Sequence, residues 1–151
     1  MEPTGINDNI PYLIGKAQHL FHLQVTNLFR KNKVNITPEQ FSVLTILWYK
    51  DGISQQEIAN LLNRDKTTLT RLINNMEKRN LVVRVPNRTD KRIRYIYLTH
   101  RGRKLQNELV SLSGQIYMDS IAGFSKKSLT QYVDFLNQTI NNLHNVVDTT
   151  S

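Results

Sequence analysis

The strongest constraint on the fold is a run of two short helical segments followed directly by two β-rich segments, between Ser54 and Leu98. Ser54-Gln55-Gln56-Glu57 has the pattern of a capping box, in which a serine and the glutamate three residues later satisfy free backbone N–H groups at a helix start. The apolar side of this first helix is expected to comprise Ile58, Ala59, Leu61 and Leu62.

A second helix is expected to begin after Asp65, a residue type that commonly caps helix N-termini. Its apolar residues recur on one face: Leu69, Leu72, Ile73 and Met76. Two short helices joined by a tight turn, the second with a polar and basic outer face, indicate a helix-turn-helix.

Two strands should follow, because Leu81–Val85 and Ile93–Leu98 are rich in β-branched and aromatic residues. They would form a hairpin, and its tip would lie in the stretch NRTDKRIR at residues 87–94. Four basic residues and a single acid, Asp90, occupy these eight positions. The expected fold class is therefore mainly α with a small β-hairpin.

Positive charge is concentrated in this part of the chain. The net charge of all 151 residues is +8, but residues 64–104 contain thirteen basic and three acidic residues, a local net charge of +10. The rest of the chain therefore carries −2. A basic segment between near-neutral ends indicates a polyanion-binding surface; the alternative is a solvated basic surface with no partner.

The polar face of the second helix supplies candidate contacts to base edges in a major groove. Threonine hydroxyls can bond bases or phosphates, and Arg71 could grip a guanine through two hydrogen bonds. The candidate residues are Lys66, Thr67, Thr68, Thr70, Arg71 and, as a weaker candidate, Asn74. Taken alone, the threonines could equally be surface residues of an ordinary amphipathic helix.

Further helices are expected on both sides of this region, the first from Asn9 to Arg30, the next capped by Thr37, and the last starting at Ser125. Together the terminal helices carry more apolar surface than one small lobe needs. The surplus favours a homodimer interface, and the alternative is a monomeric helix bundle.

Residues from Ile36 to about Leu109 resemble the MarR family of bacterial transcription regulators. The resemblance is carried by SQQEIANLL, DKTTLTRLINNMEKRNLV, the segment NRTDKRIRYIYLT, the join Leu98-Thr99 with Gly102-Arg103, and FSKKSL near the end. Residues 9–35 and 110–147 match in helical layout more than in motif.

The resemblance implies a winged helix-turn-helix homodimer on pseudo-palindromic DNA, with a recognition helix in the major groove and the hairpin, or wing, in the adjacent minor groove. Residues 36–103 would form the winged lobe, and residues 9–35 and 104–147 the dimerisation helices of a single domain, 1–151. Family members are often repressors released by small aromatic or anionic molecules. The peroxide-sensing branch uses a cysteine, and this chain has none.

In the wing, Asp90-Lys91-Arg92 matches the family's Asp-x-Arg pattern. Asp90 is expected to hold Arg92 in one orientation for minor-groove insertion; the alternative is that Asp90 only caps the turn through its own backbone. Arg88 is the rival for insertion. Phosphate contacts are expected from the remaining basic residues, Arg84, Lys91 and Arg94.

Other functions have weaker support in the sequence. His19 and His22 could share a metal, but no cysteine or carboxylate completes a ligand set, so neither a metal nor a cofactor is expected. No nucleophile-base pair or phosphate-binding glycine loop suggests an enzyme. The principal rival is a ligand-sensing or protein-binding adaptor that kept the fold without operator binding. A cytoplasmic location with no membrane partner is expected, because neither a secretory signal nor a membrane span is present.

Overall fold

The computed structural model describes residues 5–149, and the surroundings of side chains from residue 5 to residue 145. The ends of the predicted domain, residues 1–4 and 150–151, lie outside the described part, as do the side chains of residues 146 and 147 in the predicted dimerisation segment. The chain divides into two compact units, the first ending at Ile116 and the second beginning at Tyr117.

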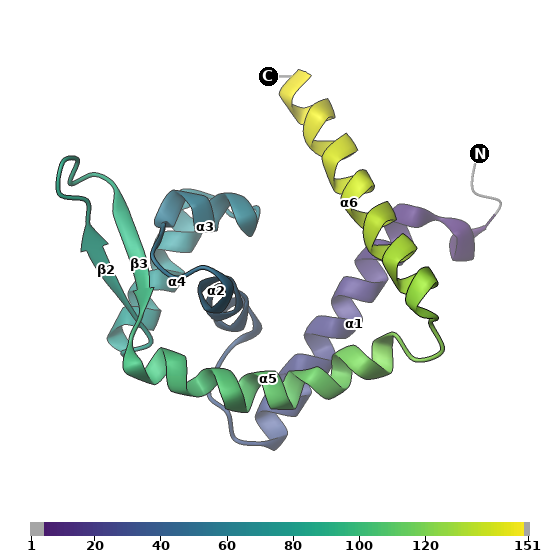
Figure 1. Cartoon of the computed structure of the whole chain (residues 1–151), viewed down its shortest axis with the longest axis horizontal. Coiled ribbons are helices and arrows are strands. Elements are labelled where there is room, and N and C mark those ends of the chain that lie inside the picture. Colours follow the sequence, from purple (N-terminus) through teal and green to yellow (C-terminus); the bar gives the residue numbers. More distant parts are fainter. Residues whose placement is uncertain (1–4, 150–151) are drawn as a thin grey trace. The chain divides into compact units, whose positions relative to one another are not determined.

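Helices dominate both units, and a small sheet belongs to the first (Figure 1). The helices are η1 (Ile6–Asp8), α1 (Ile10–Lys31), α2 (Pro38–Tyr49), α3 (Gln55–Leu61), α4 (Lys66–Lys78), α5 (His100–Ser120) and α6 (Lys126–Thr149). The strands are β1 (Ile53–Ser54), β2 (Val82–Pro86) and β3 (Arg94–Leu98). The predicted fold class, mainly α with a β-hairpin wing, is confirmed.

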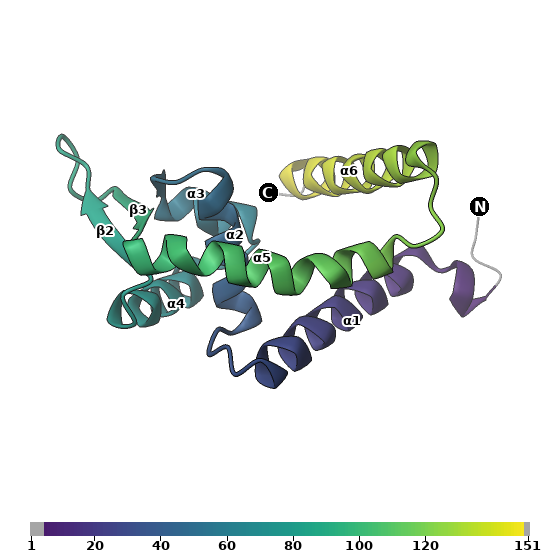
Figure 2. The same ribbon diagram turned by 60° about the horizontal axis from the view of Figure 1, so that its bottom comes forward.

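The sheet contains one strand more than the sequence suggested. Its order is β1-β3-β2 with antiparallel pairing throughout, and Ile96 of β3 lies between Ile53 of β1 and Arg84 of β2. Strand β1 has only two residues, too few for any alternating pattern to reveal it. In both views the loop between β2 and β3 projects away from α3 and α4 (Figures 1 and 2).

Helix starts follow the predicted caps with one difference. The Thr37 hydroxyl accepts from the backbone N–H of Gln40, and the Gln40 side chain accepts from that of Thr37. The Ser54 hydroxyl accepts from the N–H of Glu57, but the Glu57 carboxylate forms an ion pair with Lys50 at 2.9 Å. The predicted capping box at the start of α3 is therefore only half formed.

Three helix ends share a geometry that was not predicted from the sequence. After α1, α3 and α4 the residue beyond the C-cap has a positive φ, and it is Lys33, Asn63 and Asn80 respectively. At the end of α4 the N–H of Leu81 bonds the carbonyl of Met76 and the N–H of Asn80 bonds that of Glu77. This is a Schellman motif, which usually has glycine at the left-handed position.

One apolar core in the first unit joins α1 through α5 and the sheet, and it includes Phe29, Leu44, Ile73, Ile96 and Leu109. The predicted apolar face of α4 is largely buried, with Leu69, Ile73 and Met76 fully enclosed. The prediction that Leu61 lies on the buried side of α3 was wrong, because this residue is 59% exposed. It lies to one side of the stripe that Ile58, Ala59 and Leu62 form on this seven-residue helix.

The start of α5 is fastened to the sheet and to α2. The Thr99 hydroxyl accepts from the N–H of Gly102 at 3.1 Å and so caps α5, and the Trp48 indole donates to the Gly102 carbonyl at 3.3 Å. A β-carbon on Gly102 would lie 2.2 Å from the Leu81 carbonyl oxygen. Glycine is therefore required here because two backbones approach closely.

From the sequence, Gly52 would be the left-handed cap of the helix that begins after Thr37, and the structure differs. Helix α2 ends at Tyr49 with an extended C-cap at Lys50, so Gly52 is not its left-handed cap. Gly52 does have a φ of +72°, and its N–H bonds the Ile96 carbonyl at 3.0 Å. Its left-handed conformation serves the entry into the sheet instead.

The second unit contains the end of α5 and helix α6. Ser125 caps α6 as predicted, accepting from the N–H of Ser128 at 3.1 Å. None of the side chains of α6 described up to residue 145 is fully buried. Within the described residues, no helix combines the length and apolar character that crossing a membrane requires.

Candidate nucleic-acid interface

Helix α4 presents its polar side away from the core, as the sequence pattern predicted. Asp65 caps the helix, and its carboxylate accepts from both the N–H and the hydroxyl of Thr68, at 2.8 and 2.6 Å. These bonds lower the pKa of Asp65, the hydroxyl contributing most. The Thr68 hydroxyl proton is thus directed at Asp65 and not outward.

Three candidate residues of α4 are fully available for an external partner. Lys66, Thr67 and Arg71 are exposed, and none of them forms a side-chain hydrogen bond or ion pair with another described residue. Lys66 and Thr67 lie in the first turn, and Arg71 lies one turn further. One end of the recognition helix therefore offers an ammonium, a hydroxyl and a guanidinium to solvent.

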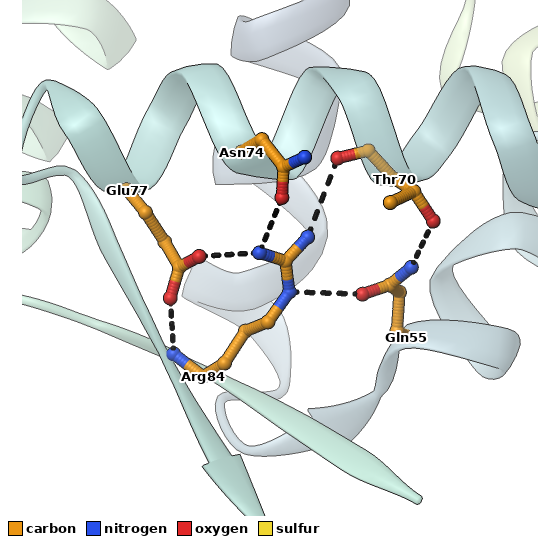
Figure 3. A network of polar contacts seen from close by, with 5 residues as sticks. All are labelled: Gln55, Thr70, Asn74, Glu77 and Arg84. Atoms are coloured by element: carbon orange, nitrogen blue, oxygen red, sulfur yellow. Dashed lines mark hydrogen bonds and ion pairs between the residues drawn. The ribbon is translucent and has the colours of Figure 1, made fainter. Parts of the chain in front are cut away.

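The other two candidates, Thr70 and Asn74, belong to a polar network between α4, β2 and the start of α3 (Figure 3). Its centre is the Arg84 guanidinium. Nε donates to the Gln55 side-chain oxygen at 3.1 Å, Nη1 to Asn74 Oδ1 at 2.6 Å, and Nη2 to the Thr70 carbonyl at 3.3 Å. Glu77 accepts from both the backbone N–H and Nη1 of Arg84.

In this arrangement Arg84, which was predicted from the sequence to contact phosphate, directs its donors to partners within the protein. The Arg84 side chain is only 15% exposed, and its donors face α4 and Gln55. A strand pattern places alternate residues on opposite faces, but it does not say which face meets a helix. Gln55 was not predicted to belong to the site, because the sequence showed it only as a residue within the capping-box pattern at the start of α3.

The wing tip is folded around Asn87. Its Oδ1 accepts from the backbone N–H groups of Thr89 and Asp90 at 2.8 and 3.0 Å, an Asx-type turn. The predicted wing contacts Arg88, Lys91 and Arg94 are exposed, and none has a side-chain bond to another described residue. The tip therefore presents free cations on an internally bonded turn.

Asp90 and Arg92 form the pair that the sequence suggested. Arg92 Nε lies 3.1 Å from Asp90 Oδ1, and Nη2 lies 3.2 Å from Oδ2. Asp90 Oδ1 also accepts from the Arg92 backbone N–H at 2.9 Å, so one carboxylate both holds the guanidinium and caps the turn. The Arg92 side chain keeps the pKa of Asp90 below its usual value, helped by the backbone bond.

Among the described residues, no three histidine, aspartate or glutamate side chains lie close enough together to hold a metal ion. Trp48, whose indole N–H donates to the Gly102 carbonyl of α5, packs against the core.

A helix-turn-helix, α3 and α4, beside a basic β-hairpin defines a winged helix-turn-helix DNA-binding protein. Sequence comparison agrees. A profile described as the MarR family matches residues 36–93. The HTH-type transcriptional regulator MgrA of Staphylococcus aureus is 30% identical over 112 residues, which cover 74% of this chain and 76% of MgrA. The chain belongs to the MarR family of transcriptional regulators.

Other relatives agree. The HTH-type transcriptional regulator TtmR of Methylorubrum extorquens (strain PA1) is 31% identical over 108 residues, 72% of this chain and 54% of TtmR, so the match spans about half the length of that relative. Among solved structures, a Listeria monocytogenes regulator described as a putative MarR family member complexed with 26mer DNA superposes with a TM-score of 0.83 at 23% identity. That match covers 90% of this chain and 89% of the Listeria chain. It supports the fold.

Proposed function

We propose that this regulator acts as a ligand-responsive repressor that binds a pseudo-palindromic operator as a homodimer. The observation that carries the proposal is the exposed Arg92 guanidinium, held in place by Asp90 at the tip of the wing. An unpaired surface arginine has many rotamers, and ordering it on binding costs roughly 1–2 kcal/mol. A side chain oriented in advance avoids part of that cost.

The wing fits a minor groove in this proposal. Narrow A·T-rich minor grooves have an enhanced negative potential that favours an inserted arginine. Arg92 is the proposed inserting residue and Arg88 its rival, while Lys91 and Arg94 contact phosphates. The Arg92 guanidinium keeps the pKa of Asp90 below its usual value, so the pair persists to lower pH than a free carboxylate would allow.

Helix α4 fits the major groove. Arg71 is proposed to reach a base edge, since it is exposed and unpaired among the described side chains. Lys66 and Thr67, in the first turn, would contact bases or phosphates. Each lost base contact of this kind costs about 1–3 kcal/mol and relaxes preference at one position.

Dimerisation has its support in exposed apolar side chains on the terminal helices. On α1 these include Ile10, Leu13, Ile14, Leu20 and Phe21, and on α6 they include Tyr132, Val133, Phe135, Ile140 and Leu143. Large exposed apolar residues repeated along a helix indicate a protein interface. A second copy of the chain is the proposed partner.

The proposed effector is a small aromatic or anionic molecule. Solved relatives include CouR of Rhodococcus jostii RHA1 bound to p-coumaroyl-CoA, with a TM-score of 0.79 at 21% identity. PcaV of Streptomyces coelicolor, solved with its natural ligand, has a TM-score of 0.74 at 16% identity. Sensing through a thiol is excluded for these 151 residues, which contain no cysteine.

Selection of bound duplexes from a random DNA pool tests the proposal directly. We expect an enriched site with two inverted half-sites one helical turn apart. The binding constant should fall steeply with salt concentration, and the slope of its logarithm against the logarithm of the salt concentration should be about −0.9 per phosphate contact. No binding at low salt would reject operator binding and favour the adaptor alternative; an enriched asymmetric single site would reject the symmetric dimer.

A further inference from the structure

The Arg84 network fixes the hydrogen-bonding direction of the side chains around it. A guanidinium has donors only, so the oxygen of each neighbouring amide must face it. Asn74 therefore turns Oδ1 toward Arg84 Nη1, at 2.6 Å, and Gln55 turns its oxygen toward Nε, at 3.1 Å. The guanidinium therefore determines which atom of each amide is the oxygen and which is the nitrogen.

The same direction continues to Thr70. With its oxygen committed to Arg84, Gln55 uses its Nε2 to donate to the Thr70 hydroxyl oxygen at 2.8 Å (Figure 3). The Thr70 hydroxyl thus accepts one bond, and its own proton is free. No described residue accepts from that proton or from the Asn74 Nδ2 group.

The guanidinium at the centre is firmly held. Four of its N–H groups have partners, and Glu77 accepts from the Arg84 side chain and backbone together. The Glu77 and Arg84 side chains are 31% and 15% exposed. The restricted exposure strengthens these bonds relative to bonds at an open surface.

We propose that Arg84 is a positioning residue, which makes Thr70 and Asn74 present hydrogen-bond donors to the DNA. Their partners are then acceptors, either guanine N7 and O6 in the major groove or phosphate oxygens. Asn74 is held away from the two-bond contact with adenine, which needs its Oδ1 for the adenine N6 amino group. The inference rests on the proposed DNA recognition by α4 and deepens it.

The test uses the site selected by the wild-type protein, so operator binding is established first and independently. Binding is measured to duplexes in which single guanines are replaced by 7-deazaguanine, which lacks the N7 acceptor, or single phosphates by methylphosphonate. The Asn74→Ala and Thr70→Ala variants are measured on the same set. The two arms separate a base acceptor from a phosphate acceptor.

We expect Asn74→Ala to weaken wild-type affinity about tenfold, in line with one lost base or phosphate contact. One of the substituted duplexes, lacking a guanine N7 or a phosphate acceptor, should weaken binding of the wild-type protein by the same factor. It should not weaken binding of Asn74→Ala further, and this non-additivity is the coupling between Asn74 and its acceptor. Coupling of Asn74 to the adenine N6 amino group instead would overturn the proposal. So would unchanged binding by both the Asn74 and the Thr70 variants.

Arg84→Met tests the positioning role itself. Removal of the guanidinium frees the Asn74 amide to turn, so its coupling to the acceptor should disappear and adenine at the contacted position should become better tolerated. Arg84→Lys provides a second variant that keeps a cation beside Glu77 but lacks the planar fork, and it should lose the coupling too. Coupling that survives in a folded variant would assign Arg84 a structural role only.

Arg94→Met is the charge-matched control, because it removes one wing cation that has no described side-chain partner. It should weaken binding to all duplexes alike, except one substituted at the phosphate that Arg94 itself contacts, and leave the Asn74 coupling intact. Loss of coupling in this control would show that net charge, and not the Arg84 geometry, sets the preference. That result would also overturn the proposal.

Discussion

The base and the tip of the wing each contain an arginine, and the two differ in what surrounds them. Arg84, at the base, is 15% exposed and is bonded to α4 and to Gln55. Arg92, at the tip, is 91% exposed and is bonded only to Asp90 among the described residues. Equal charge in one hairpin therefore serves two purposes: the base fixes the wing to the recognition helix, and the tip stays free for a partner.

The base also depends on backbone contacts, and Gly102→Ala should have the largest effect on stability. The added β-carbon would meet the Leu81 carbonyl oxygen at 2.2 Å, where neither backbone can yield easily. We expect a loss of about 3 kcal/mol in the free energy of unfolding, measured by urea denaturation. Gly114→Ala is the control, since nothing lies within 4 Å of its β-carbon, and it should not destabilise the protein.

The two arginines should respond differently to the same substitution. Arg84→Met removes the guanidinium bonds to Gln55, Thr70, Asn74 and Glu77, and Glu77 keeps only its bond from the backbone N–H of residue 84, so the free energy of unfolding should fall by about 2 kcal/mol. Arg92→Met should leave the thermal midpoint unchanged, because its side chain is in solvent. Equal losses in the two variants would remove the distinction between base and tip.

Substitution at the tip should affect DNA affinity and not stability. Arg92→Ala should weaken operator binding about tenfold, comparable with the loss of one specific contact, without changing stability. Fluorescence anisotropy on the selected site measures the change. Arg88→Ala is the informative companion, since a larger loss there would make Arg88 the inserting residue.

Asp90 can be separated into its two roles with a matched pair of variants. Asp90→Asn keeps an oxygen for the Arg92 backbone N–H but removes the charge that holds the guanidinium, whereas Asp90→Ala removes both. If orientation of Arg92 matters, both should weaken binding by roughly threefold, a smaller loss than that of the arginine itself, because only part of the ordering cost is restored. Full affinity in Asp90→Asn would make the aspartate a turn residue alone.

The smallest effect is expected in the turn between α4 and the wing. Asn80 has a φ of +55° in the Schellman motif, a conformation that glycine adopts without strain. Asn80→Gly should therefore raise the free energy of unfolding by about 0.5 kcal/mol, the relief of strain exceeding the added entropy of the unfolded chain. A decrease would show that the Asn80 side chain itself stabilises the base of the wing.

Much of the fold could be predicted because its signals are local. Caps at Thr37, Ser54 and Asp65, the apolar stripe of α4, and the β-branched runs of the hairpin each depend on residues a few positions apart. The Asp90–Arg92 pair was predictable for the same reason, since its partners are two residues apart.

The sequence by itself thus determined the order of the main helices and of the two hairpin strands, the basic hairpin and the membership of the MarR family. Tertiary structure decided what neither periodicity nor charge could express: that Arg84 faces α4, that Gln55 joins it, and that Gly102 meets Leu81. Those partners lie 14, 29 and 21 positions apart. A pattern of charge shows that a cation is present, but only the packing of distant segments determines whether its donors meet the protein or remain free for DNA.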